Sequence, residues 1–165
     1  MSAELYYRDG GNPQGPPVLL VHAFPTSHAL WEFQLAALGE TYRLIRPDLR
    51  GFGQSPLTIS PSSMRDFVDD LTQLLDQLEV SRVNYVGISM GGMIGQAFAL
   101  AEPQRVQSLS LCMTTSAIPE QVPDNEDANY FVSKALFQRA LATIESNGME
   151  PVVEMCLDRW FTPSF

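Results

Sequence analysis

The stretch from Val83 to Ala101 places the tightest constraint on how this 165-residue chain can fold. A short apolar run, Val83 to Val86, leads into a Gly-x-Ser-x-Gly pentapeptide centred on Ser89, and a run of helical character follows from Met93. A strand that turns into a helix within so few residues leaves no space for side chains beside the serine, which explains the two glycines. The pattern therefore predicts that the Ser89 hydroxyl is exposed at the end of a strand, where it can attack a carbonyl group if a base takes its proton.

Short apolar runs alternate with helical patterns along the first 115 residues. Ser63 and Asp66 resemble a capping box at the start of the clearest helix. This alternation is typical of an α/β fold with a mainly parallel sheet, right-handed crossovers and helices on both faces. We predict strands at residues 4–8, 17–21, 42–45, 83–88 and 106–112, and helices at 28–38, 63–79 and 93–101.

The pattern changes after residue 115, which divides the chain into a first part, 1–115, and a second part, 116–165. Residues 116–128 are rich in Pro, Asp, Glu and Asn and are predicted to form a linker. Helical patterns follow at 128–147 and 151–160, and no strand pattern returns.

The composition excludes several classes of partner. A net charge of −9 argues against nucleic acids and anionic membrane surfaces. The sequence has neither a signal-peptide pattern nor an apolar run long enough to span a bilayer, so we expect a cytoplasmic setting. Its two cysteines lack metal-site spacing, and Cys112, at the end of an apolar run, is expected to be a buried thiol.

Three motifs occur together in a recognisable order. They are the tetrapeptide His22 to Pro25, the loop from Asp48 to Ser55 (Asp-x-Arg-Gly-x-Gly-x-Ser) and the pentapeptide around Ser89. Together they resemble the α/β-hydrolase family. Residues 87–96, 105–112 and 159–163 further resemble 3-oxoadipate enol-lactonases and related esterases. The resemblance covers only the N-terminal part of such a protein, so that the C-terminal strands are absent and residues 116–165 correspond to the start of a helical cap.

The resemblance implies a role for several residues. Ser89 is the nucleophile, and the backbone N–H groups of Phe24 and Met90 form the oxyanion hole. Ala23 stands where the family usually has glycine. The alternative for Ser89 is a serine in an ordinary strand-to-helix turn.

Five apolar side chains could line a substrate pocket for an acyl or lactone group, and core packing explains each of them at least as well: Trp31, Met93, Phe131, Phe137 and Trp160.

The other polar residues of the motifs have structural interpretations. The family places His22 beneath the oxyanion loop as a hydrogen-bonding residue rather than as a base. His28 is expected to be exposed or to lie at the pocket mouth. Asp48 and Arg50 are interpreted as residues that fix a loop, in preference to a catalytic acid and a substrate clamp.

The sequence lacks the base that the nucleophile needs. The order of the triad in this fold is Ser, then Asp or Glu, then His, and no histidine follows Ser89. We therefore expect a separate C-terminal chain to supply the triad Asp and His. The apolar strand at 106–112 would otherwise form an exposed sheet edge, which promotes aggregation.

Two functions remain open at this point. The first is a serine hydrolase that acts on a small-molecule carboxylic ester or enol-lactone through an acyl-enzyme on Ser89, without metal or cofactor. The second is an inactive module that self-associates through its open sheet edge. Relatives with an aspartate nucleophile are disfavoured because position 89 is serine, whereas a cofactor-free haloperoxidase, which has the same triad, stays open.

Overall fold

The computed structural model describes residues 4–57, 63–115, 139 and 142–162. The chain forms two compact units, residues 1–116 and residues 117–165, which are described separately.

The first unit is built on a five-stranded sheet with the strand order β1-β3-β2-β4-β5. β1 runs antiparallel to β3, and every other pair of neighbouring strands is parallel. The carboxyl ends of the parallel strands therefore lie at one edge of the sheet. The strands are β1 (Tyr7–Gly11), β2 (Pro17–Val21), β3 (Arg43–Pro47), β4 (Val83–Ile88) and β5 (Val106–Cys112).

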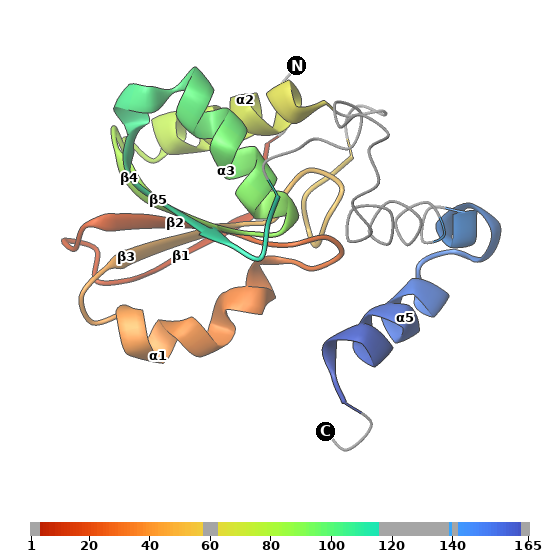
Figure 1. Cartoon of the computed structure of the whole chain (residues 1–165). Helices are drawn as coiled ribbons and strands as arrows, with labels where there is room; N and C mark the ends of the chain where they lie inside the picture. The colour runs from red at the N-terminus through yellow and green to blue at the C-terminus, as the bar shows by residue number, and fades with distance from the viewer. Residues whose placement is uncertain (1–3, 58–62, 116–138, 140–141, 163–165) are drawn as a thin grey trace. The chain divides into compact units, whose positions relative to one another are not determined.

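Helices cover both faces of this sheet (Figure 1), as the sequence predicted. One face carries α2 (Met64–Gln77) and α3 (Met90–Ala101), and the other carries the 3-10 helix η1 (His28–Gln34) with α1 (Leu35–Leu38). A short 3-10 turn, η2 (Pro103–Arg105), precedes β5.

The alternation of side chains along the strands divides the core into two clusters. The larger cluster lies under α2 and α3 and includes Leu19 and Tyr85. The smaller one consists of Val18, Leu20, Trp31 and Leu44, with residues of η1 and α1 packed against it. Because successive residues of a strand point to opposite faces, the continuous apolar run of β2 supplies both clusters.

The predicted capping box at the start of α2 is confirmed. The backbone N–H of Asp66 donates to Ser63 Oγ at 3.3 Å, and the Asp66 carboxylate accepts from the Ser63 backbone N–H at 2.8 Å. These two bonds satisfy N–H groups that a helix start leaves without partners.

Several boundaries differ from the sequence-based ones. The first strand runs over Tyr7–Gly11 rather than 4–8, because its ladder pairs Tyr7 with Pro47 and Gly11 with Arg43. The third strand correspondingly extends to Pro47. The predicted helix at 28–38 begins as the 3-10 helix η1, a form common at helix starts. α3 begins at Met90, three residues early, since the Ser89 carbonyl already accepts helical bonds.

β5 is an outer strand of the described sheet, and most of its residues are exposed. The prediction of a buried Cys112 is therefore wrong: its side chain is exposed at the end of a strand that has no strand neighbour on its outer side in the described sheet. The expectation of an exposed apolar edge is met, since Leu109 is 36% exposed and Leu111 is 42% exposed.

The described part of the second unit is helical. Residues 142–147 form a helical segment, and α5 (Glu150–Trp160) follows after Gly148, whose φ of 77° ends the first segment. Pro151 lies in the first turn of α5, where its missing N–H costs no bond. The predicted linker at 116–128 and most of the predicted helix at 128–147 lie outside the described residues, and the cap stays a prediction. None of the described helices is both long and apolar enough to cross a bilayer.

Candidate active site

Ser89 lies between β4 and α3 with an unusual backbone conformation. Its φ is 52° and its ψ is −114°, a combination that residues with side chains rarely adopt. Such strain persists only where the surroundings hold it, and it is concentrated at functional sites. Ser89 is half-buried rather than enclosed.

The glycines on either side of Ser89 are required by close backbone contacts. A methyl group on Gly87 would collide with the Gly91 carbonyl oxygen, and one on Gly91 would collide with the Val21 carbonyl oxygen at the end of β2. The Tyr85 hydroxyl, buried in the core, donates to the Gly91 carbonyl oxygen at 2.8 Å. Complete burial raises the pKa of Tyr85 well above 10.0, so this hydroxyl remains a donor. Sequence reasoning missed the role of Tyr85, because its place in the apolar run of β4 is that of an ordinary core residue.

The two predicted oxyanion donors follow neighbouring parallel strands. β2 and β4 pair with Val21 opposite Gly87, and Phe24 and Met90 each come three residues later. The loops that carry them therefore leave the sheet at the same edge. Met90 is also the first residue of α3, where backbone N–H groups point away from the helix. This arrangement suits a pair of N–H groups aimed at a developing negative charge.

The end of β5 holds the Ser89 backbone in place through two hydrogen bonds. The Ser89 N–H donates to the Cys112 carbonyl oxygen at 2.9 Å, and the Ser89 carbonyl oxygen accepts from the Thr114 hydroxyl at 2.7 Å. Met113 has a φ of 46°, which turns the chain back toward α3 after the strand. Sequence reasoning missed Thr114, because nothing in its neighbourhood marks it apart from its position after a strand.

His22 is a structural residue, in agreement with the family's pattern. Its Nε2 accepts from the Leu49 backbone N–H at 3.0 Å, and its Nδ1 lies 2.8 Å from the Ala23 carbonyl oxygen. These partners require a neutral ring that is protonated on Nδ1. Burial lowers the pKa of His22, although the Ala23 hydrogen bond and the Asp48 charge oppose this effect. With both nitrogens engaged, His22 does not serve Ser89 as a base.

Asp48 joins the start of η1, which follows the loop after β2, to the loop after β3. Its carboxylate accepts from the His28 backbone N–H at 2.6 Å, from His28 Nδ1 at 2.8 Å and from the Gln54 backbone N–H at 2.9 Å. Burial alone would raise the pKa of Asp48, but these hydrogen bonds lower it below its usual value. The interpretation of Asp48 as a loop-fixing residue agrees with this geometry, and His28 is its half-buried partner rather than a solvent-exposed residue.

Arg50 also fixes its loop. Its guanidinium donates from Nε and Nη2 to the two carboxylate oxygens of Asp70 on α2, each at 2.6 Å, and both side chains are buried. The hydrogen bond to Asp70 raises the pKa of Arg50 further, so the guanidinium stays charged. Arg50 is thus committed to α2 and holds the loop after β3 against that helix.

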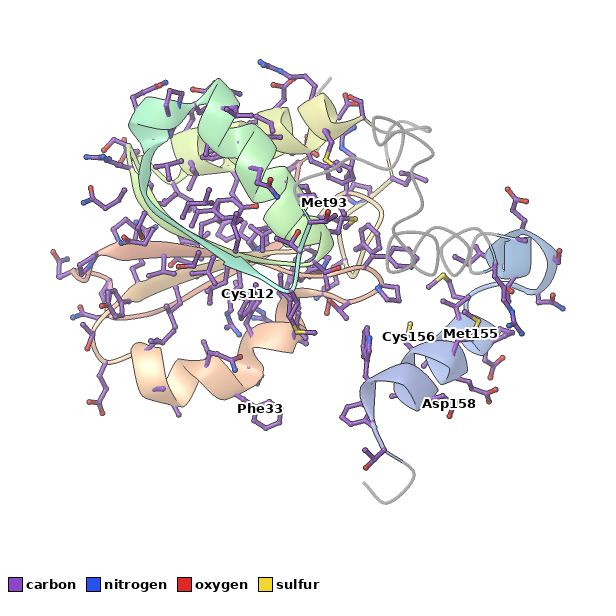
Figure 2. The ribbon with its side chains drawn as sticks, viewed as in Figure 1. Phe33, Met93, Cys112, Met155, Cys156 and Asp158 are labelled. Atoms are coloured by element: carbon purple, nitrogen blue, oxygen red, sulfur yellow. The ribbon has the colours of Figure 1, made fainter. Side chains whose placement is uncertain are left out.

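The predicted pocket residues that the structure describes lie in different surroundings, whereas Phe131 and Phe137 lie outside the described residues. Trp31 is 8% exposed and packs in the smaller core cluster. Met93 is half-buried on the first turn of α3, close in sequence to Ser89 (Figure 2). Trp160 belongs to α5 in the second unit and is 49% exposed. A shared pocket formed by these residues stays a prediction.

Two surface depressions contain none of the predicted site residues. One is lined by residues 4–7 and Gln54, and the other by Leu157, Asp158, Phe161 and Thr162 on the second unit. Within the described residues, no group of three or more His, Cys, Asp or Glu side chains could hold a metal ion.

Comparison with known proteins agrees with this architecture. Residues 16–148 match the family described as the alpha/beta hydrolase fold. The chain is 27% identical to 3-oxoadipate enol-lactonase 2 of Acinetobacter baylyi over 161 residues. This aligned region covers 98% of this chain and 55% of that protein.

Solved structures give the same result. The enol-lactonase of Burkholderia xenovorans superimposes with a TM-score of 0.80 at 31% identity, covering 98% of this chain and 58% of that one. A thermophilic esterase of Thermogutta terrifontis gives a TM-score of 0.79 at 33% identity, covering 97% of this chain and 55% of that one. The chain therefore spans about half the length of the relatives it matches.

Proposed function

Because the chain belongs to the α/β-hydrolase family, we propose that it is the nucleophile-bearing part of a serine hydrolase acting on a carboxylic ester or an enol-lactone. The observation that carries this proposal is the conformation of Ser89, whose φ of 52° is maintained at the turn between β4 and α3 by glycines that no other residue could replace. The similarity to an enol-lactonase and an esterase supports this class of substrate.

The proposed reaction proceeds through an acyl-enzyme. A base takes the proton of Ser89 Oγ as this oxygen attacks the substrate carbonyl carbon, and the N–H groups of Phe24 and Met90 stabilise the resulting oxyanion. The tetrahedral intermediate then expels the alkoxide or enolate, which takes the proton from the base. Water attacks the acyl-enzyme with the help of the same base, releasing the acid and restoring Ser89. This sequence requires neither metal nor cofactor.

We propose that the base and its orienting acid, a His and an Asp, come from a separate C-terminal chain, called the complement below. Both histidines of this chain have structural partners: His22 is engaged by Leu49 and Ala23, and His28 by Asp48. The exposed outer strand β5 is a suitable docking place for the complement. A cytoplasmic setting belongs to the same proposal, since the exposed thiol of Cys112 would stay reduced there.

Hydrolysis of p-nitrophenyl acetate tests the proposal. We expect Ser89-dependent turnover when the chain and the complement are mixed, little turnover by this chain alone, and a return to background in Ser89→Ala. Equal, negligible rates with and without the complement, unaffected by Ser89→Ala, would exclude the proposed function.

The alternative function is an inactive module that self-associates. The exposed apolar side chains of β5, Leu109 and Leu111, favour it, because an open strand is a template for pairing with a second copy. The intact mass of the native complex separates the two functions: a second polypeptide supports the hydrolase, and a pure homo-oligomer supports the module.

A further inference from the structure

The two peptide groups that carry the predicted oxyanion donors share an unusual environment. The N–H of Phe24 belongs to the peptide group whose carbonyl is that of Ala23, and the N–H of Met90 belongs to the peptide group whose carbonyl is that of Ser89. Each of these two carbonyl oxygens accepts three hydrogen bonds, and in each case one of the three donors is a threonine hydroxyl at 2.7 Å.

At the Phe24 peptide group, all three donors come from the neighbouring loop. The Ala23 carbonyl oxygen accepts from the Thr26 hydroxyl at 2.7 Å, from the Thr26 N–H at 2.9 Å and from His22 Nδ1 at 2.8 Å. His22 and Ala23 are buried and Thr26 is half-buried, so these bonds are partly shielded from water.

At the Met90 peptide group, the donors come from α3 and from the segment after β5. The Ser89 carbonyl oxygen accepts from the Gly92 N–H at 2.9 Å, from the Met93 N–H at 3.1 Å and from the Thr114 hydroxyl at 2.7 Å. Gly92 allows this approach, because a methyl group there would contact the Thr114 side chain at 2.7 Å.

A hydrogen bond to a peptide carbonyl acts on the N–H of the same peptide group. The group is planar, so fixing the direction of its C=O also fixes the direction of its N–H. Hydrogen bonds in series also polarise one another, by roughly 10–30% per bond, which makes the N–H a better donor.

We infer that Thr26 and Thr114 are a pair of positioning residues that orient and polarise the two oxyanion-hole N–H groups, those of Phe24 and Met90. The inference rests on the proposed function, because it assigns the threonines a part in stabilising the same oxyanion. Neither threonine has to touch the substrate.

Removing either hydroxyl should lower kcat and leave KM nearly unchanged, since the negative charge develops only in the transition state. Loss of a whole oxyanion donor costs roughly 10²–10³-fold in kcat, so losing roughly 10–30% of its strength predicts a loss of about two- to eightfold. Because the two peptide groups are separate, the two losses in kcat should multiply. The double variant with Thr26→Val and Thr114→Val should therefore lose about 4- to 60-fold.

The experiment compares kcat and KM for p-nitrophenyl acetate in the complex of this chain with the complement. Thr26→Val and Thr114→Val remove the hydroxyls, and Thr26→Ser and Thr114→Ser should restore the rate. Thr72→Val is the matched control, because the Thr72 hydroxyl makes the same kind of bond, at 2.9 Å to the Val68 carbonyl oxygen, within α2. Equal losses in Thr72→Val, an effect on KM alone, or no rescue by serine would overturn the inference.

A second measurement separates failure of the inference from failure of the proposed function. In NMR spectra of the full 165-residue chain, the amide proton of Phe24 should move upfield in Thr26→Val, and that of Met90 in Thr114→Val. Both should return in the serine variants. If Ser89 shows no activity but these shifts occur, the proposed function fails and the threonine effect on the peptide groups stands; unmoved resonances overturn the inference whatever the activity.

Discussion

At the scale of single residues, His22 connects the acid sensitivity of the fold to the loop after β2 that carries the proposed oxyanion donor Phe24. The ring accepts a hydrogen bond from the Leu49 N–H at Nε2. A proton on Nε2 would therefore replace this bond by two N–H donors that face each other, which is unfavourable. Burial lowers the pKa of His22 below its usual 6.5 in the folded chain. The unfolded chain therefore takes up this proton at a higher pH than the folded chain does.

The folded chain should therefore lose stability as the pH falls. The contribution of neutral His22 to the free energy of unfolding is fully present above about pH 6.5. It declines as the pH falls from there through the lowered pKa of His22. We expect the urea midpoint of the chain to fall between about pH 7 and pH 5. In His22→Gln, where the side-chain oxygen can still accept from Leu49, this slope should flatten. An unchanged slope in the variant would show that another group is responsible.

The glycines around Ser89 allow a second prediction. Gly87→Ala places a methyl group against the Gly91 carbonyl, and backbone atoms cannot give way as a flexible side chain can. We expect the free energy of unfolding to drop by about 3 kcal/mol. Gly10→Ala in β1 is the control, because a methyl group there meets no atom within 4 Å, and its effect should stay within about 0.5 kcal/mol. Urea unfolding followed by circular dichroism gives both values, and similar losses in the two variants would contradict this account of the turn.

At the scale of elements, two of the ion pairs on α2, one buried and one exposed, make an internal comparison possible. Asp70 holds Arg50 in a buried, two-bond pair, whereas Asp69 pairs with Arg65 at 2.8 Å on the surface of the same helix. Asp70→Asn leaves a buried guanidinium with only partial compensation from Asp66, whose carboxylate lies 3.8 Å away.

The expected costs differ accordingly. Asp70→Asn should lower the free energy of unfolding by about 3 kcal/mol, because the remaining charge is buried. Asp69→Asn should change it by no more than about 0.5 kcal/mol, because water screens that pair. Urea unfolding of the two variants side by side measures the difference, and equal costs would mean that the Arg50–Asp70 pair does not hold α2.

Sequence reasoning worked best where a local pattern decides the structure. The ends of β4 and β5, the cap at Ser63 and the order of the elements agree with the predictions because they depend on apolar runs, spacing and turn residues. It worked less well where pairing across the sheet decides, as in the register of β1 against β3. Contacts such as that from Thr114 to Ser89, 25 residues apart, leave no periodic trace in the sequence.

At the scale of the whole molecule, the outer strand β5 links the site to association. Its carbonyl at Cys112 and the following Thr114 both bond to Ser89, so the strand whose end holds Ser89 in place is also an exposed outer strand. β5 contains no charged residue, and charges are a common means by which proteins protect such edges.

We therefore expect the complement and a second copy of the chain to compete for β5. Alone, the chain should self-associate in sedimentation velocity, and the complement should convert it to a 1:1 complex. Leu111→Lys, which places a charge on the exposed strand, should weaken both associations, because burying an unpaired ammonium is costly. Leu100→Lys is the matched control, since Leu100 is 85% exposed on α3. If both variants associate like the original chain, β5 is not the shared interface. The same holds if the complement binds without dissociating the homo-oligomer.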